Sequence, residues 1–184
     1  EEGYFDLKEV VNGICTKLIN RHPHVFNNVD LDMSQFEKTW EELKRDEKGE
    51  TSITSGLKRI PNHLPALIKA EKIQHKAALI GFDWDDIKDV FEKIEEEYKE
   101  LLDECKQGNI KYIKEELGDL LFSIVNLARF LHIDSEEALN LTNQKFINRF
   151  EFMEENASKL HKKLEDLTLD QMEELWQSAK KNKL

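Results

Sequence analysis

Four acidic side chains are placed symmetrically about one glycine, Gly108. Glu97 and Glu100 precede it, and Glu116 and Asp119 follow it at matching distances along the chain. Each pair is three residues apart, a spacing that puts both side chains on one face of a helix. If the chain turns back at Gly108 as a helical hairpin, the four carboxylates converge, and like charges at that separation need a cation between them. The sequence therefore predicts an acidic helical hairpin that binds a metal ion.

Helical periodicity dominates the rest of the chain, in which glycine and proline are scarce, with seven and three residues respectively. We find no strand pattern and predict an all-α helical bundle. Ser135 and Thr168 are the expected N-caps of the last two helices. The predicted helices span residues 6–21, 34–46, 65–79, 85–106, 110–132, 135–162 and 169–181.

The composition is that of an acidic protein large enough to bury a core. The chain has 184 residues, of which 39% are hydrophobic, and a net charge of −11. This charge argues against nucleic acid or an anionic membrane as a partner, because no dominant basic surface is available. No apolar run reaches the roughly 20 residues of a membrane span. Cys15 and Cys105 match no metal-ligand spacing, which favours free thiols in the cytoplasm.

A narrow polar stripe crosses the helix that follows Gly108. The helix is apolar on most sides between 117 and 131, and such a helix is expected to be buried. Buried carboxylates need partners, and metal coordination is an adequate one. Carboxylates without histidine or cysteine suit Mg²⁺ or Mn²⁺ rather than zinc. The alternative interpretation is an exposed charged strip. The polar stripe consists of Glu116, Asp119, Ser123 and Asn126.

The sequence also contains an internal repeat. Most of its matches lie at an offset of 128 residues and join Asp6, Glu9, Asn12 and residues 17–21 to Asp134, Glu137, Asn140 and residues 145–149. Trp40 and Lys44 correspond to Trp176 and Lys180, slightly out of register with these matches. We therefore expect residues 1–48 to be the tail of a first module, residues 49–62 a linker, and residues 63–184 a complete second module. The chain starts without methionine, and we expect a fragment whose first acidic hairpin would lie upstream.

Several further side chains are candidates for binding or catalysis. Glu96 could act as a base or support the metal ligands. Lys145 and Arg149 share a helix face and could clamp a polyphosphate, although an ordinary surface charge pair has the same spacing. Trp176 could stack on a nucleobase, whereas aromatic residues on amphipathic helices more often belong to the core.

The residues at these sites resemble the MazG nucleotide pyrophosphohydrolases, and the resemblance covers essentially the whole chain. The EExxE pattern is formed by Glu96, Glu97 and Glu100, and the ExxD pattern by Glu116 and Asp119 within EELGDLLF. The other similar segments are RHPHVF at 21–26, GFDW at 81–84, KFINRF at 145–150 and the late Trp176.

The resemblance implies an all-α, usually dimeric enzyme that uses magnesium to hydrolyse nucleoside triphosphates to the monophosphate and pyrophosphate. The implied metal ligands are Glu97, Glu100, Glu116 and Asp119, and the implied nucleotide contacts are Lys145, Arg149 and Trp176. The proton acceptor is Glu96 or Glu97, and the sequence does not decide between them. Two alternatives remain: a helical interaction module without enzymatic activity, and a pyrophosphatase limited to non-standard nucleotides.

Overall fold

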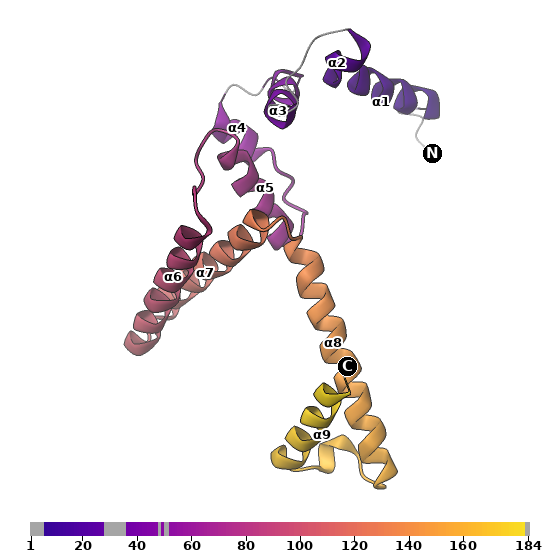
Figure 1. Cartoon of the computed structure of the whole chain (residues 1–184), viewed down its shortest axis with the longest axis vertical. Coiled ribbons are helices and arrows are strands. Elements are labelled where there is room, and N and C mark those ends of the chain that lie inside the picture. The colour runs from indigo at the N-terminus through magenta and orange to yellow at the C-terminus, as the bar shows by residue number, and fades with distance from the viewer. Residues whose placement is uncertain (1–5, 28–35, 48, 50–51, 183–184) are drawn as a thin grey trace. The chain divides into compact units, whose positions relative to one another are not determined.

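The structure is a computed structural model that describes residues 6–27, 36–47, 49 and 52–182. Every regular element within these ranges is helical, which confirms the all-α prediction (Figure 1). No helix in the described ranges has the length and apolar character that crossing a membrane requires. The helices are α1 (Leu7–Arg21), α2 (Pro23–Phe26), α3 (Phe36–Glu47), α4 (Ile53–Lys58), α5 (Ala66–Ala78), α6 (Ile87–Gln107), α7 (Ile110–Phe130), α8 (Ser135–Lys159), the 3₁₀ helix η2 (Leu164–Asp166) and α9 (Leu169–Lys181).

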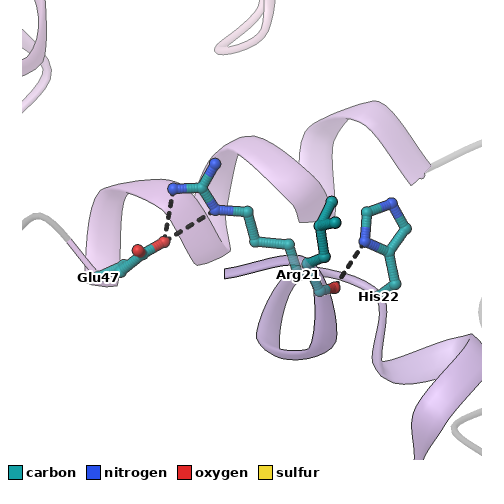
Figure 2. Close-up of polar contacts among 4 residues, drawn as sticks. Arg21, His22 and Glu47 are labelled. Carbon is teal, nitrogen blue, oxygen red and sulfur yellow. Dashed lines mark hydrogen bonds and ion pairs between the residues drawn. The ribbon is translucent and has the colours of Figure 1, made fainter. Parts of the chain in front are cut away.

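The chain divides into two compact units, of which the first comprises residues 1–63 and 72–83. Within it, α1 packs against α2 and α3. Arg21 at the end of α1 binds Glu47 at the end of α3, with Nη2 2.6 Å and Nε 2.8 Å from the same oxygen, Oε2. His22 Nδ1 lies 2.8 Å from the carbonyl oxygen of Leu18. Figure 2 shows both contacts at the junction between these helices.

The second unit comprises residues 64–71 and 84–184, and its main feature is the helical hairpin of α6 and α7. Figure 1 shows these two helices side by side and antiparallel. Gly108 ends α6 with a φ of 74°, a left-handed conformation that costs glycine little. The Asn109 side chain then accepts a hydrogen bond from the Lys111 amide at 3.2 Å and starts α7. The turn therefore lies where the sequence predicts it.

The starts of α1 and α8 are built in the same way. Asp6 Oδ1 accepts a hydrogen bond from the amide of Glu9 at 2.6 Å, and Asp134 Oδ1 accepts one from the amide of Glu137 at 2.9 Å. The N-cap of α8 is therefore Asp134, and the prediction of Ser135 was wrong by one residue. The carboxylate of Asp134 reaches the third amide of the helix, so the helix begins at Ser135.

Three short helices were not predicted, and one of them lies within the segment expected to be a linker. Ser52 and Ser55 exchange side-chain hydrogen bonds with each other's amides and thereby start α4. The other two are α2 and η2. Elsewhere the predicted helices agree with the observed ones to within about three residues. The predicted start of α3 at residue 34 lies outside the described residues.

The apolar surface of α7 is less buried than its sequence predicts. Only Ser123 and Val125 on this helix are buried. Leu117, Leu121 and Ile124 keep 46–49% of their surface exposed. On α6, Phe91 is 49% exposed. The expectation that the single chain buries this helix was therefore wrong, because the hairpin leaves an apolar surface uncovered.

Candidate metal centre

Three of the predicted ligands come together across the hairpin. Glu97 on α6, and Glu116 and Asp119 on α7, each offer a carboxylate oxygen, and these oxygens all lie within 4.8 Å of one another. The turn at Gly108 makes Glu97 and Asp119 neighbours because they lie at equal distances before and after it, and Glu116 lies one helical turn before Asp119 on the same face of α7. We call these three residues the acidic cluster.

The acidic cluster spans the boundary between the interior of the hairpin and solvent. Glu97 is buried with 5% exposure, Glu116 is half-buried, and Asp119 is exposed. Partial burial raises the pKa of Glu116 above its ordinary value, and the negative charges of Glu100 and Asp119 raise it further. The arrangement therefore carries an electrostatic cost that a bound cation would relieve.

Glu100 lies outside the acidic cluster. It is exposed on α6, and its carboxylate is not one of the three that share the 4.8 Å spacing. Its charge nevertheless acts on the cluster, because after burial it is the largest cause of the raised pKa of Glu116. Glu96 is also exposed, with 55% of its side chain accessible.

A cation that was not predicted from the sequence lies beside the acidic cluster. Lys93 Nζ lies 2.7 Å from Glu97 Oε1 and 3.1 Å from Glu96 Oε1. The hydrogen bond with Glu97 is the main reason that the pKa of Lys93 is raised, although burial of the amine acts in the opposite direction. The sequence did contain a signal, because Lys93 stands four residues before Glu97 and therefore lies on the same helix face.

The acidic cluster fits a hard divalent cation. Its donors are all carboxylate oxygens, which Mg²⁺ and Mn²⁺ prefer. Such a cation would also compensate the repulsion that raises the pKa of Glu116. Within the described residues, this is the one group of three or more acidic, histidine or cysteine side chains with spacing suited to a metal.

The predicted nucleotide contacts lie on α8 and α9. The Arg149 guanidinium carbon lies 5.2 Å from the centre of the Trp176 ring, and Lys145 is exposed one turn before Arg149. Trp176 itself is half-buried against Phe146, at 5.1 Å between ring centres, and Phe150, at 6.2 Å. The tryptophan is thus part of an aromatic group beside a cation, a combination that suits both packing and base stacking.

Comparison with known proteins assigns the chain to a family. The model of the MazG nucleotide pyrophosphohydrolase domain matches residues 1–26 and 86–152. A nucleoside triphosphate pyrophosphohydrolase/pyrophosphatase MazG from Thermotoga maritima is 44% identical over 98% of this chain and 68% of its own length. A nucleoside triphosphate pyrophosphohydrolase from Escherichia coli is 39% identical over 100% of this chain and 71% of its own length. The uncharacterized protein YabN of Bacillus subtilis is 45% identical over 98% of this chain and 37% of its own length.

The all-α fold and these relatives define the class of the protein, which is that of a hydrolytic enzyme. The chain belongs to the MazG nucleotide pyrophosphohydrolase family. The segment matched between residues 86 and 152 contains the whole acidic hairpin together with Lys145 and Arg149 of α8.

Proposed function

We propose that the chain hydrolyses nucleoside triphosphates to nucleoside monophosphate and pyrophosphate with Mg²⁺, or Mn²⁺, held by the carboxylates of the α6–α7 hairpin. The reaction class comes with family membership and with the names of the relatives. The observation that carries the metal assignment is the convergence of Glu97, Glu116 and Asp119 to within 4.8 Å.

Glu100 is proposed as a fourth ligand that joins when the cation is present. Its position three residues after Glu97 puts it on the same face of α6, and its charge already acts on Glu116. When bound, the cation would supply Lewis-acid chemistry by neutralising phosphate charge and lowering the pKa of a water. Because triphosphate and carboxylates are both anionic, the acidic hairpin needs such a cation to accept its substrate.

The other candidate side chains are assigned to proton transfer and to substrate binding. Glu97 is a buried member of the acidic cluster and is assigned as a ligand, which leaves the exposed Glu96 to accept the proton of the attacking water. Lys145 and Arg149 would bind phosphate oxygens, Arg149 through its planar fork. Trp176 would stack on the base.

We further propose a homodimer. Apolar side chains on both helices of the hairpin remain 40–52% exposed, which is more than an isolated chain needs to display and suits a second copy as cover. Phe91→Glu should shift the protein from dimer to monomer in light scattering after gel filtration, whereas Lys88→Gln, which changes the charge equally, should not. The exposed apolar side chains of the hairpin are those of Phe91, Tyr98, Leu102, Leu117, Leu121, Phe122 and Ile124.

We further propose that the chain contains parts of two modules and lies in the cytoplasm. The repeated aspartate caps at Asp6 and Asp134 support the proposal that residues 1–48 correspond to part of the module at 63–184, with 49–62 as a linker. Cys15 and Cys105 are free and exposed, which supports a reducing, cytoplasmic setting.

The identity of the products tests the proposed reaction. The protein is incubated with a nucleoside triphosphate and magnesium, and the products are resolved by anion-exchange chromatography. Nucleoside monophosphate with pyrophosphate supports the proposal, whereas nucleoside diphosphate with phosphate contradicts the cleavage site. Absence of any hydrolysis across the standard nucleotides would favour the non-enzymatic module or a pyrophosphatase limited to non-standard nucleotides, which inosine and deoxyuridine triphosphates would then separate.

A further inference from the structure

The last turn of α6 contains an acidic side chain that the proposed function does not use. Glu104 is half-buried, and its Oε2 is shielded from solvent without a hydrogen-bond partner. The other oxygen, Oε1, accepts only a long hydrogen bond from Gln107 Nε2, at 3.4 Å. The backbone carbonyl of Glu104 accepts a hydrogen bond from the Gly108 amide at 2.9 Å, which fixes the residue beside the hairpin turn. The carboxylate has therefore lost hydration and gained little in exchange.

The lysines close to Glu104 in the sequence pair with other acids. Lys106 Nζ lies 2.6 Å from Asp103 Oδ1, and Lys111 Nζ lies 3.9 Å from Glu115 Oε1. Within the part of the chain that the structure describes, neither lysine forms an ion pair with Glu104. The partly buried acid is therefore left without the charged partner that exposed acids nearby possess.

Three local effects make an acidic residue unfavourable at position 104. Burial of a carboxylate without good hydrogen bonds is one of them. The carbonyl end of a helix carries partial negative charge, which disfavours an acid in its last turn. Burial is the main cause of the raised pKa of Glu116, and the negative charges around it, including that of Glu104, raise it further. A residue that is unfavourable on several counts at once is expected to serve function rather than stability.

Glu104 lies on the face of α6 that also carries Glu97 and Glu100. It follows Glu100 by four residues and Glu97 by seven, and these spacings align the three side chains along one face. At 1.5 Å per residue, Glu104 lies about 10 Å along the helix from Glu97, too far to share a cation with it directly. Its charge still acts at this range, because electrostatic attraction falls only with the inverse of distance and a partly buried charge is screened incompletely.

We propose that Glu104 is a positioning residue of the metal centre, whose negative charge tightens the binding of the divalent cation without touching it. The inference rests on the proposed metal role of the acidic cluster. The charge of Glu104 repels those of Glu100 and Glu116, and a bound cation relieves this repulsion. The metal-free protein is therefore destabilised by Glu104, and the cation binds more tightly because it removes that destabilisation.

Mn²⁺ binding in the absence of nucleotide, followed by the electron paramagnetic resonance signal of the free ion, tests the proposal. Glu104→Gln should keep the stoichiometry of the parent and raise the dissociation constant roughly tenfold, as loss of groups outside the ligand shell commonly does. Asp103→Asn, which removes the same charge from an exposed position on α6, should change the dissociation constant by less than about twofold. Glu104→Asp retains the charge and should stay within about threefold of the parent.

The order of the two Glu104 variants separates charge from packing. Glutamine preserves the size and shape of glutamate, whereas aspartate preserves its charge and leaves a small void. If Glu104→Asp bound Mn²⁺ more weakly than the parent while Glu104→Gln bound it equally well, Glu104 would only fill space and the proposal would be overturned. Loss of a whole Mn²⁺ equivalent in Glu104→Gln would also overturn it, because Glu104 would then be a ligand.

Thermal melting provides a second readout, which needs no activity. In EDTA, Glu104→Gln should melt at a higher temperature than the parent, because a poorly compensated charge has been removed. Added Mn²⁺ should narrow this difference, since the ion binds the parent more tightly and stabilises it more. A lower melting temperature for Glu104→Gln in EDTA would contradict the proposal. A parent that binds no Mn²⁺ would refute the metal centre itself, whereas equal binding by the parent and Glu104→Gln would refute only the role of Glu104.

Discussion

Lys93 Nζ lies 2.7 Å from Glu97 Oε1, so the buried acid of the hairpin has a cation on its own helix. The other two members of the acidic cluster, Glu116 and Asp119, are acidic like Glu97 and add no positive charge. Lys93 therefore offsets part of the negative charge of the hairpin before any metal binds. A cation bound at the acidic cluster would change how much this ion pair contributes to stability, and mutation can test that.

Replacing Lys93 by methionine should destabilise the metal-free protein by about 1 kcal/mol, because a buried carboxylate then loses its charged partner. For a chain of this size, the melting temperature should fall by about 2–4 °C. Saturating magnesium should remove most of that difference by neutralising Glu97. Lys99→Met is the matched control, since the Lys99–Glu95 pair is exposed on both sides. Equal losses with and without magnesium would contradict the proposed role of Lys93.

Glu116→Gln should change how the stability of the metal-free protein depends on pH. A raised carboxyl pKa means that the folded chain holds this proton more tightly than the unfolded chain does. The stabilisation that protonated Glu116 contributes is therefore complete below the ordinary pKa of 4.5. It is lost as the pH rises through the pKa of Glu116 in the folded chain.

In a chelating buffer near neutral pH, the Glu116→Gln protein should accordingly have a higher melting temperature than the parent. This gap in melting temperature should close as the pH falls toward the ordinary pKa of the Glu116 carboxyl group. Thermal melts across this range measure the gap directly. A gap that does not vary with pH would show that the charge of Glu116 is not the cause.

Asp119→Asn should lower kcat/KM for triphosphate hydrolysis by more than about a hundredfold, beyond the loss usual for groups that only support metal ligands. Glu100→Gln should lower it by roughly tenfold, because Glu100 lies outside the acidic cluster. Rates of pyrophosphate release across a range of magnesium concentrations give both values. The order of the two effects matters: a larger loss from Glu100→Gln would place the metal differently on the hairpin.

Asp134→Ala should destabilise the protein by about 1 kcal/mol, because the N-cap of α8 is lost. Ser135→Ala should be neutral or slightly stabilising, because the buried hydroxyl of Ser135 has no hydrogen-bond partner. Urea unfolding of both variants measures the difference. If Ser135→Ala were the more damaging substitution, the assignment of the cap would be wrong.

Much of the fold follows from local sequence signals. Gly108 and Asn109 specify the hairpin turn through a left-handed end and a side-chain cap, both of which are local. Thr168 caps α9 as predicted, with the amide of Gln171 at 3.3 Å. Helix α4 was missed because its capping box is formed by two serines, Ser52 and Ser55, rather than by the usual serine and glutamate.

The candidate site was predictable only in part. The convergence of Glu97 and Asp119 was predictable, since equal distances from a turn make residues neighbours across a hairpin, and Glu116 shares the helix face of Asp119. The same argument gave Glu100 equal weight, although the burial of Glu97 and the exposure of Glu100 separate the two. Burial depends on packing that periodicity does not specify, and the partly exposed face of α7 shows the same limit.

Triphosphate hydrolysis should depend on a cation that the acidic cluster holds. Pyrophosphate release is measured for the parent and for Asp119→Asn in EDTA and during a magnesium titration. The parent should be inactive in EDTA and should recover with added magnesium, while Asp119→Asn should need far more magnesium or stay inactive. Undiminished hydrolysis by the parent in EDTA, or a magnesium response unchanged by Asp119→Asn, would contradict the claim.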